Sequence, residues 1–191
     1  MKQRPSFPAR LDSGKPQAAP KTLLGATRVV MPQSPARAKP VGMASPTGVG
    51  LDSSAIRARM VKKLAEQGID DAVVLEAMGR VERHRFVDSA LVNQAYEDTS
   101  LPIGLGQTIS KPNVVARMIA LLREAPGLQG APLMGRVLEI GTGCGYQAAV
   151  LACVAREVYS IERLRGLHDK ARENLRPMRL PNVHMIFGDG M

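Results

Sequence analysis

Apolar residues recur at helical spacing in two segments early in the chain. Apolar side chains between residues 56 and 64 are three or four positions apart, which predicts an amphipathic helix capped by a serine at 53–54. A second apolar set at 73–78 predicts another helix, with an aspartate at 70–71 as its cap. We expect residues 51–100 to form a small helical cap ahead of a sheet domain.

Three short apolar runs of strand composition follow, at 136–140, 157–161 and 183–187. Two segments with helical character separate them, at 146–155 and 164–175. Strands that alternate with helices favour a parallel sheet, because the chain must cross back between one strand and the next. The predicted fold class is therefore α/β, with a Rossmann-like sheet.

The segment 101–112 lies between these two groups. Its glycines and prolines predict a loop, followed by an apolar helix at 114–122. Thr108 and Ser110 stand just before that helix. Considered alone, either hydroxyl is better explained as an N-cap than as a reactive group, because a capping hydroxyl accepts a hydrogen bond from a free amide of the first turn.

The turn after the first run holds three glycines at alternate positions, Gly141, Gly143 and Gly145. Glycine lets a ligand approach the backbone, because no Cβ stands in the way. A dinucleotide-binding turn has its third glycine one position later, where this chain carries Tyr146. Glu139, two residues before the turn, would repel a pyrophosphate. Its charge suits a cationic group, such as the amino group of S-adenosylmethionine.

Acids also stand where the second and third runs end. Glu162 follows Glu139 by 23 positions, close to the ~20-residue spacing at which a carboxylate meets ribose hydroxyls. Asp189 follows the third run, between two glycines. Each acid has a simpler alternative: an arginine pair for Glu139, an exposed helix start for Glu162, and a turn for Asp189. Three such acids around one glycine turn favour ligand binding.

The charge of the chain is concentrated at its start. Residues 1–50 hold eight Lys/Arg, one acid and eight of the fourteen prolines, whereas 51–191 hold eighteen Lys/Arg and sixteen acids. Such a segment cannot bury enough apolar surface to fold alone, so we predict a disordered basic tail. It could be an arm for nucleic acid, a targeting segment, or the product of an upstream start before Met31 or Met43. A solvated tail without a fixed role is the favoured interpretation.

The remaining composition argues against membrane and metal sites. No run reaches the ~18 apolar residues of a membrane span. Cys144 and Cys153 have no Cys or His at a metal-ligand spacing, so we predict no metal site and a reducing, cytoplasmic location. His84 in an arginine-rich turn is expected to be structural or solvated, and His168 on a charged helix is expected to be solvated.

Several of these motifs together resemble the protein-L-isoaspartate O-methyltransferase family. The resemblance rests on the glycine turn within 137–147, on the Tyr-Glu-Asp sequence at 96–98, and above all on Gln-Thr-Ile-Ser at 107–110. The last motif is much more specific than a glycine turn. The resemblance covers about residues 54–190. It implies a class I methyltransferase that depends on S-adenosylmethionine, with 101–191 as the N-terminal half of the methyltransferase domain.

The resemblance implies methyl transfer from S-adenosylmethionine to the α-carboxyl of L-isoaspartyl residues in damaged proteins and peptides. That carboxylate is already ionised near neutral pH, so alignment and exclusion of water can supply most of the rate without a general base. Ser110 would position the acceptor carboxylate. The implied cofactor contacts are Thr108, Ile109, Glu139, Gly141, Thr142, Gly143, Gly145, Glu162, Asp189 and Gly190.

The resemblance also implies a sheet of seven strands ordered 3-2-1-4-5-7-6, of which the first three lie in this chain. The run at 136–140 would then be an open apolar edge. We therefore expect this chain to be an inactive fragment. At full length we expect the protein to be a monomer. Two alternatives stay open. One is a half-domain that binds a nucleotide-like ligand or a partner without catalysis. The other is a nucleic-acid methyltransferase, although 3% aromatic residues and no Trp argue against a pocket for a flipped base.

Overall fold

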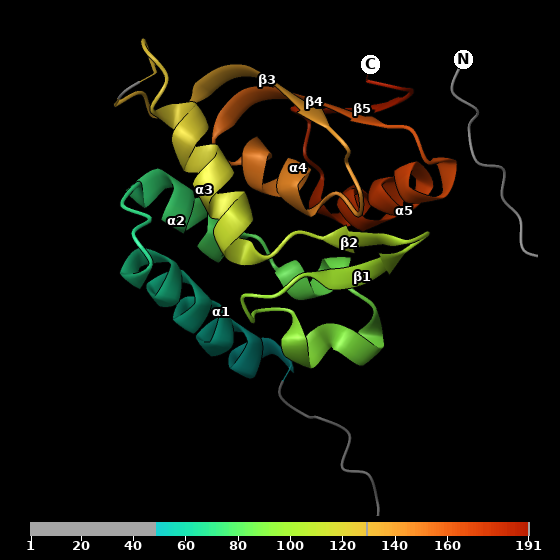
Figure 1. Ribbon diagram of the computed structural model, residues 1–191, viewed down its shortest axis with the longest axis horizontal. Coiled ribbons are helices and arrows are strands. Elements are labelled where there is room, and N and C mark those ends of the chain that lie inside the picture. The colour runs from blue at the N-terminus through green and yellow to red at the C-terminus, as the bar shows by residue number, and fades with distance from the viewer. Residues whose placement is uncertain (1–48, 129, 191) are drawn as a thin grey trace, which may run out of the picture. The chain divides into compact units, whose positions relative to one another are not determined.

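A computed structural model describes residues 49–128 and 130–190, which belong to one compact unit (Figure 1). The helical region contains α1 (Val49–Glu66), α2 (Ala72–Arg80), η1 (Arg83–Phe86) and η2 (Ser89–Gln94). The rest contains β1 (Leu101–Gly104), β2 (Gln107–Ile109), α3 (Pro112–Arg123), β3 (Met134–Ile140), α4 (Tyr146–Ala152), β4 (Ala155–Glu162), α5 (Arg165–Leu175), η3 (Arg176–Met178) and β5 (Val183–Phe187). Within the described ranges, no helix is both long enough and apolar enough to cross a bilayer.

Both predicted helices of the first region are present, but only the start of the second was predicted correctly. The predicted cap at 53–54 is wrong, because α1 is already helical from Val49. The cap of α2 is confirmed: Asp71 Oδ1 accepts hydrogen bonds from the amides of Val73 at 2.8 Å and Val74 at 3.2 Å. The predicted tail lies outside the described residues, except where α1 begins.

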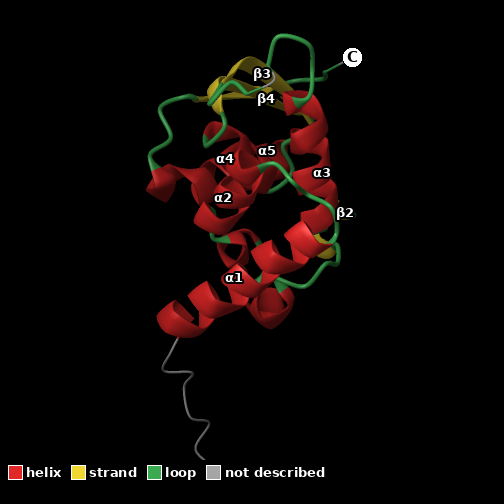
Figure 2. Ribbon diagram, turned by 90° about the vertical axis from the view of Figure 1, so that its left-hand side faces the viewer, coloured by secondary structure: helices red, strands yellow, loops and turns green. Residues whose placement is uncertain are grey.

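Strands β3, β4 and β5 form a parallel sheet in that order. Helices α4 and α5 lie along one face of this sheet, α2 packs against α4, and α3 runs beside them from near β3 toward β2 (Figures 1 and 2). The α/β class and the Rossmann-like sheet are confirmed. The helix predicted at 146–155 is too long by three residues, because Ala155 already belongs to β4.

The core runs across the predicted boundary at residue 100. Tyr146 at the start of α4 is 1% exposed and packs edge-on against Phe86 of η1, with ring centroids 5.5 Å apart. The buried Arg83 guanidinium lies 4.9 Å from the centre of the same ring. Its Nε donates to the carbonyl of Ala95 at 2.7 Å. The cap region therefore shares its apolar interior with the sheet.

The opposite face of the sheet carries no helix in the described part of the chain (Figures 1 and 2). On that face Leu138, Ile140 and Ile186 are 60%, 62% and 41% exposed. One edge of β3 also pairs with no strand that the structure describes. The strand order places β3 at this edge of the described sheet, and the open apolar edge at 136–140 stays a prediction.

The segment 101–112 is a hairpin, and the prediction of a loop is wrong. Gly104 pairs with Gln107, which leaves Leu105 and Gly106 as a two-residue turn. Both turn residues have positive φ, 52° and 69°, as a type I′ turn requires. The Nζ of Lys170 on α5 donates to the carbonyl of Ile103 at 2.8 Å, which holds the hairpin against the sheet domain.

The start of α3 shows whether Thr108 or Ser110 caps this helix. Lys111 is the N-cap residue and gives no side-chain cap. A more distant group satisfies the helix start: Asp98 Oδ1 accepts from the Asn113 amide at 3.0 Å. Thr108 lies within β2. The N-cap explanation of Thr108 and Ser110 is therefore wrong.

Candidate functional site

Two adjoining pockets lie between the hairpin and the ends of the parallel strands. They share four lining residues, Ile103 and Thr108 from the hairpin and Gly141 and Gly143 from the glycine turn. The larger pocket has a volume of about 200 Å³ and extends to the ends of β4 and β5. The smaller has about 60 Å³ and extends to the end of β3. This is the edge where ligands bind in open parallel sheets.

The smaller pocket gathers residues that lie far apart in the sequence. The β2–α3 connection brings Ser110 to it, beside Ile109, which is buried. From the sheet side, β3 supplies Glu139 and the glycine turn supplies Thr142. The most specific motif of the sequence and the glycine turn therefore meet at one place.

Glu139 is a buried acid held by hydroxyl groups. The Ser160 hydroxyl donates to Glu139 Oε2, and Ser160 Oγ lies 2.6 Å from Thr142 Oγ1. No arginine pairs with Glu139 among the described residues, so that alternative is wrong. The pKa of Glu139 is raised to about 7: burial raises it most, the Ser160 hydrogen bond lowers it, and the charge of Glu162 also raises it. A bound cation would favour the ionised carboxylate.

Glu162 links the glycine turn to the start of α5. Its Oε2 accepts from the Gly143 amide at 2.9 Å, and its Oε1 accepts from the Leu164 amide at 2.8 Å. The alternative of an exposed acid is wrong, because Glu162 is 5% exposed, although its bond at the start of α5 agrees with a helix-start acid. Glu162 also lines the larger pocket.

The turn after β5 closes the far side of the larger pocket. Asp189 and Gly190 both line it. A Cβ on Gly190 would lie 2.7 Å from Cγ2 of Ile140, so only glycine lets this turn approach β3 so closely. The alternative of Asp189 as a turn residue is compatible with this position.

Gly145 lines neither pocket, in contrast to the other predicted cofactor contacts. It is the N-cap of α4 with φ of 90°, and a Cβ there would lie 3.1 Å from the Leu175 side chain. The structure gives Gly145 a packing role, because α5 lies directly against it. Its contact with a cofactor stays a prediction.

The sequence interpretation missed the hairpin residues that cover the site. Ile103 lines both pockets, and Gln107 lines the larger one. The available signal was the alternation along 101–104, where Leu101 and Ile103 are buried and their neighbours are exposed. That alternation is typical of a strand with one face toward the core.

The histidines have structural positions. His168 was expected to be solvated, which is wrong: it is 6% exposed and packs edge-on against Phe187, with ring centroids 5.6 Å apart. His84 Nδ1 lies 2.7 Å from the Tyr96 hydroxyl, which agrees with the structural alternative. Burial lowers the pKa of His84. Over the described ranges, no three potential metal ligands come together.

The site fits a ligand with a cationic end and hydroxyl groups. Glu139 is a buried carboxylate without a cationic partner in the described residues. A Cβ at Gly141 would meet nothing within 4 Å, so the backbone there is open to a close approach. Glu162 lies across the turn and also faces the larger pocket. A parallel sheet with this turn and these acids has the Rossmann-like class I methyltransferase fold.

Comparison with known proteins narrows the class to one family. The family described as Protein-L-isoaspartate(D-aspartate) O-methyltransferase (PCMT) matches residues 55–191. The chain belongs to this family, and the resemblance seen in its sequence is confirmed.

Two bacterial relatives and a solved structure give the extent of the similarity. The protein-L-isoaspartate O-methyltransferase of Methylibium petroleiphilum is 56% identical over 97% of this chain and 68% of its own length. That of Leptothrix cholodnii is 67% identical over 75% of this chain and 50% of its own length. A solved protein-L-isoaspartate O-methyltransferase is similar with a TM-score of 0.60 and 29% identity, over 70% of this chain and 42% of that one. The chain thus spans between 42% and 68% of the length of these three proteins.

Proposed function

We propose that the protein transfers a methyl group from S-adenosylmethionine to the α-carboxyl of L-isoaspartyl residues in damaged proteins. The observation that carries the proposal is the meeting of Ser110 and Glu139 at one pocket that opens beside the glycine turn. Family membership supports the same reaction. The two free cysteines, Cys144 and Cys153, support a reducing compartment, so we place the activity in the cytoplasm.

The residues of the two pockets suit the parts of S-adenosylmethionine, which supplies a methyl group on a positively charged sulfur. Glu139 would pair with the amino group of its methionine part, and Thr108, Ile109 and the turn residues 141–145 would surround that part. Glu162 would accept hydrogen bonds from the ribose hydroxyls. Asp189 and Gly190 would border the adenine.

Ser110 is proposed to hold the acceptor. Its hydroxyl would donate to one carboxylate oxygen of the isoaspartyl residue, which leaves the other oxygen to attack in line with the methyl–sulfur bond. The acceptor is anionic and the donor is cationic, so the reaction joins opposite charges and needs no general base. The apolar side chains of Ile103 and Ile109 would exclude water from the reacting atoms.

The test is methyl transfer from tritiated S-adenosylmethionine to a peptide with one isoaspartyl residue, beside the same peptide with a normal aspartyl residue. The proposal predicts labelling of the isoaspartyl peptide alone, whereas the inactive fragment expected from the resemblance would label neither peptide. Ser110→Ala should lower kcat about tenfold to a hundredfold, as loss of one hydrogen bond to a charged group does, with cofactor affinity unchanged. Ser89→Ala on η2 is the matched control, because this exposed serine lies outside both pockets. Equal labelling of both peptides would contradict the proposal.

A second candidate function is cofactor binding without transfer. The exposure of Ile140 favours it, because this residue lines the larger pocket and is 62% exposed, which leaves that wall open to water. Transfer to a carboxylate requires that water be excluded. Binding of S-adenosylhomocysteine together with no labelling of the isoaspartyl peptide would favour this second candidate.

A further inference from the structure

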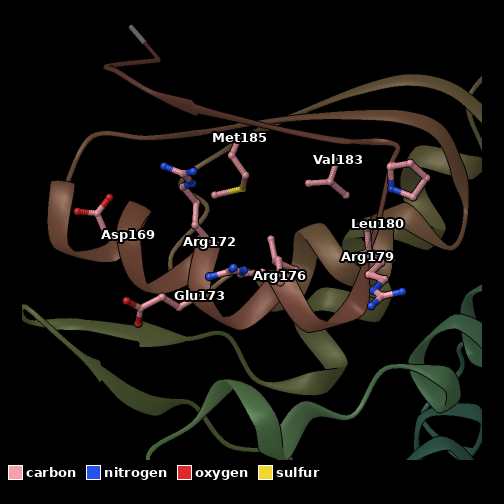
Figure 3. A pocket seen from close by; sticks show the side chains of 10 residues that line it. Asp169, Arg172, Glu173, Arg176, Arg179, Leu180, Val183 and Met185 are labelled. Carbon is pink, nitrogen blue, oxygen red and sulfur yellow. The ribbon is translucent and has the colours of Figure 1, made fainter.

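A groove of about 900 Å³ lies between β5 and the segment formed by α5 and η3 (Figure 3). It shares no lining residue with the two pockets at the glycine turn. Its floor is apolar: Leu175 is buried, and Leu180, Val183 and Met185 are half-buried. Side chains of this kind can accept apolar groups from a partner.

Three arginines line the same groove. Arg172, Arg176 and Arg179 are exposed, and none forms an ion pair within the part of the chain that the structure describes. Figure 3 shows Asp169 and Glu173 toward one end of the groove and Arg179 toward the other. The groove therefore offers an apolar surface beside unpaired positive charge, which is complementary to a segment that alternates acidic and apolar residues.

The strand beside the groove has a free edge. β5 pairs with β4 on one side, and among the described residues no strand pairs with its other side. A free strand edge presents unpaired amide and carbonyl groups that can bind an extended chain. Side chains of an added strand alternate between the two faces of the sheet, so every second one would point toward the groove.

Arg179 has a backbone conformation that is unusual for its type. Its φ is 48°, in the left-handed region that favours glycine, at the residue that ends η3. A non-glycine residue in this conformation is under strain. The chain nevertheless has an arginine here, and its side chain lines the groove.

We propose that this groove binds an extended acidic and apolar segment of a protein partner, which adds to the sheet as a strand beside β5. A polypeptide fits better than a nucleic acid for two reasons. No aromatic side chain lines the groove, so bases would have nothing to stack on. A polypeptide can place its acidic side chains beside the arginines and an uncharged one beside Asp169 and Glu173, whereas a nucleic acid carries a phosphate at every position. The inference does not rest on the proposed function, because the two sites share no residue.

The test uses the 191-residue chain and a fluorescein-labelled peptide of eight residues that alternates Glu and Val. We expect saturable binding by fluorescence anisotropy, weakened about tenfold or more by the double substitution Arg176→Glu and Arg179→Glu. Arg59→Glu on α1 is the control, because it reverses one charge as each of these substitutions does. It should leave the affinity unchanged, because Arg59 is exposed and lies outside the groove. Equal weakening by Arg59→Glu would overturn the proposal.

Four further arms separate this proposal from its alternatives. Arg179→Gly should raise the melting temperature by relieving the backbone and still weaken the peptide, so a loss cannot be attributed to unfolding. If a peptide that alternates Glu and Ser binds as tightly as the Glu and Val peptide, the proposed contact with the apolar floor is overturned. Two further Glu and Val peptides carry N-methyl groups, one on its odd-numbered residues and the other on its even-numbered residues. An added strand forms hydrogen bonds to β5 from alternate residues only, so one of the two peptides should bind less tightly. Unchanged affinity of both peptides would overturn strand addition. Stronger binding of single-stranded oligothymidine would show a nucleic-acid site instead.

Discussion

At the residue scale, Glu139 should make stability depend on pH. Its pKa is raised from 4.5 to about 7 in the fold, so the folded state disfavours the ionised form. Stability is therefore lost as pH rises from about 4.5 through about 7. Glu139→Gln removes this loss, and Ser160 can still donate to the amide oxygen. We expect the variant to gain stability over the parent on the order of 2 kcal/mol at pH 8, and little at pH 4.5.

Urea denaturation at several pH values measures this difference. Glu173→Gln is the control for the loss of one carboxylate, because Glu173 is exposed on α5 and lies outside both pockets at the glycine turn. Parallel curves for Glu139→Gln and the parent would show that Glu139 titrates alike in the folded and unfolded chains. That result would contradict the account of its burial.

A second prediction at the residue scale concerns the packing of the glycine turn. Gly145→Ala should destabilise the fold by about 2–4 kcal/mol, because it adds a Cβ in the left-handed region and also 3.1 Å from Leu175. Gly130→Ala is the matched control: its φ of 73° carries the same backbone cost, but a Cβ there would meet nothing within 4 Å. Thermal unfolding compares the two variants. Equal losses would show that packing against α5 adds nothing at Gly145.

At the element scale, one carboxylate both starts α2 and neutralises a buried arginine. Asp71 caps α2 through Oδ1, and its Oδ2 lies 2.6 Å from Nε of Arg123, which is 7% exposed. Burial raises the pKa of Asp71, but bonds from Arg123 and two backbone amides lower it more, so the pKa is lowered overall. Asp71 therefore adds stability that is present above pH 3.8 and is lost as pH falls through its lowered pKa.

Asp71→Ala should cost about 2–4 kcal/mol, because it removes the cap and leaves Arg123 buried without its partner. Asp71→Asn should cost less, since an amide oxygen still caps the helix. Asp88→Ala, at the exposed cap of η2, is the control and should cost less than either. Urea denaturation gives the three values. A loss for Asp71→Asn as large as for Asp71→Ala would show that the charge alone matters.

The elements also show where sequence reasoning succeeds. Periodicity predicts α2 and β3 to β5 well, because one face of each is buried against the core. It misses the hairpin, since Leu105 has a positive φ that its residue type does not indicate. It misplaces the cap of α3, because the stabilising carboxylate of Asp98 comes from another part of the chain. Interactions between distant parts of the chain therefore determine both the hairpin and the start of α3.

At the scale of the whole molecule, the sequence predicts much of the candidate site for a geometric reason. The carboxyl ends of parallel strands meet at one edge, so acids that end successive strands must lie close together. Glu139 and Glu162 could be found in this way. Lys170 could not, because its hydrogen bond to the carbonyl of Ile103 depends on how the hairpin lies against α5.

The uncovered sheet face predicts self-association of this chain. Leu138, Ile140 and Ile186 are exposed together beside the open edge of β3. Surfaces of this kind promote association between copies. We expect sedimentation velocity to show oligomers at concentrations of tens of micromolar, roughly where weak apolar contacts form. Leu138→Lys with Ile186→Lys should shift the chain toward monomer, whereas a monomer at every concentration would contradict the expectation.

The central claim is that the glycine turn with its acids holds S-adenosylmethionine and not a dinucleotide. Isothermal titration of the 191-residue chain with S-adenosylhomocysteine, and separately with NAD, tests it most directly. We predict saturable binding of S-adenosylhomocysteine, weakened about tenfold or more by Glu162→Gln, and no binding of NAD. Binding of NAD with equal or higher affinity, or no binding of S-adenosylhomocysteine by folded protein, would contradict the account.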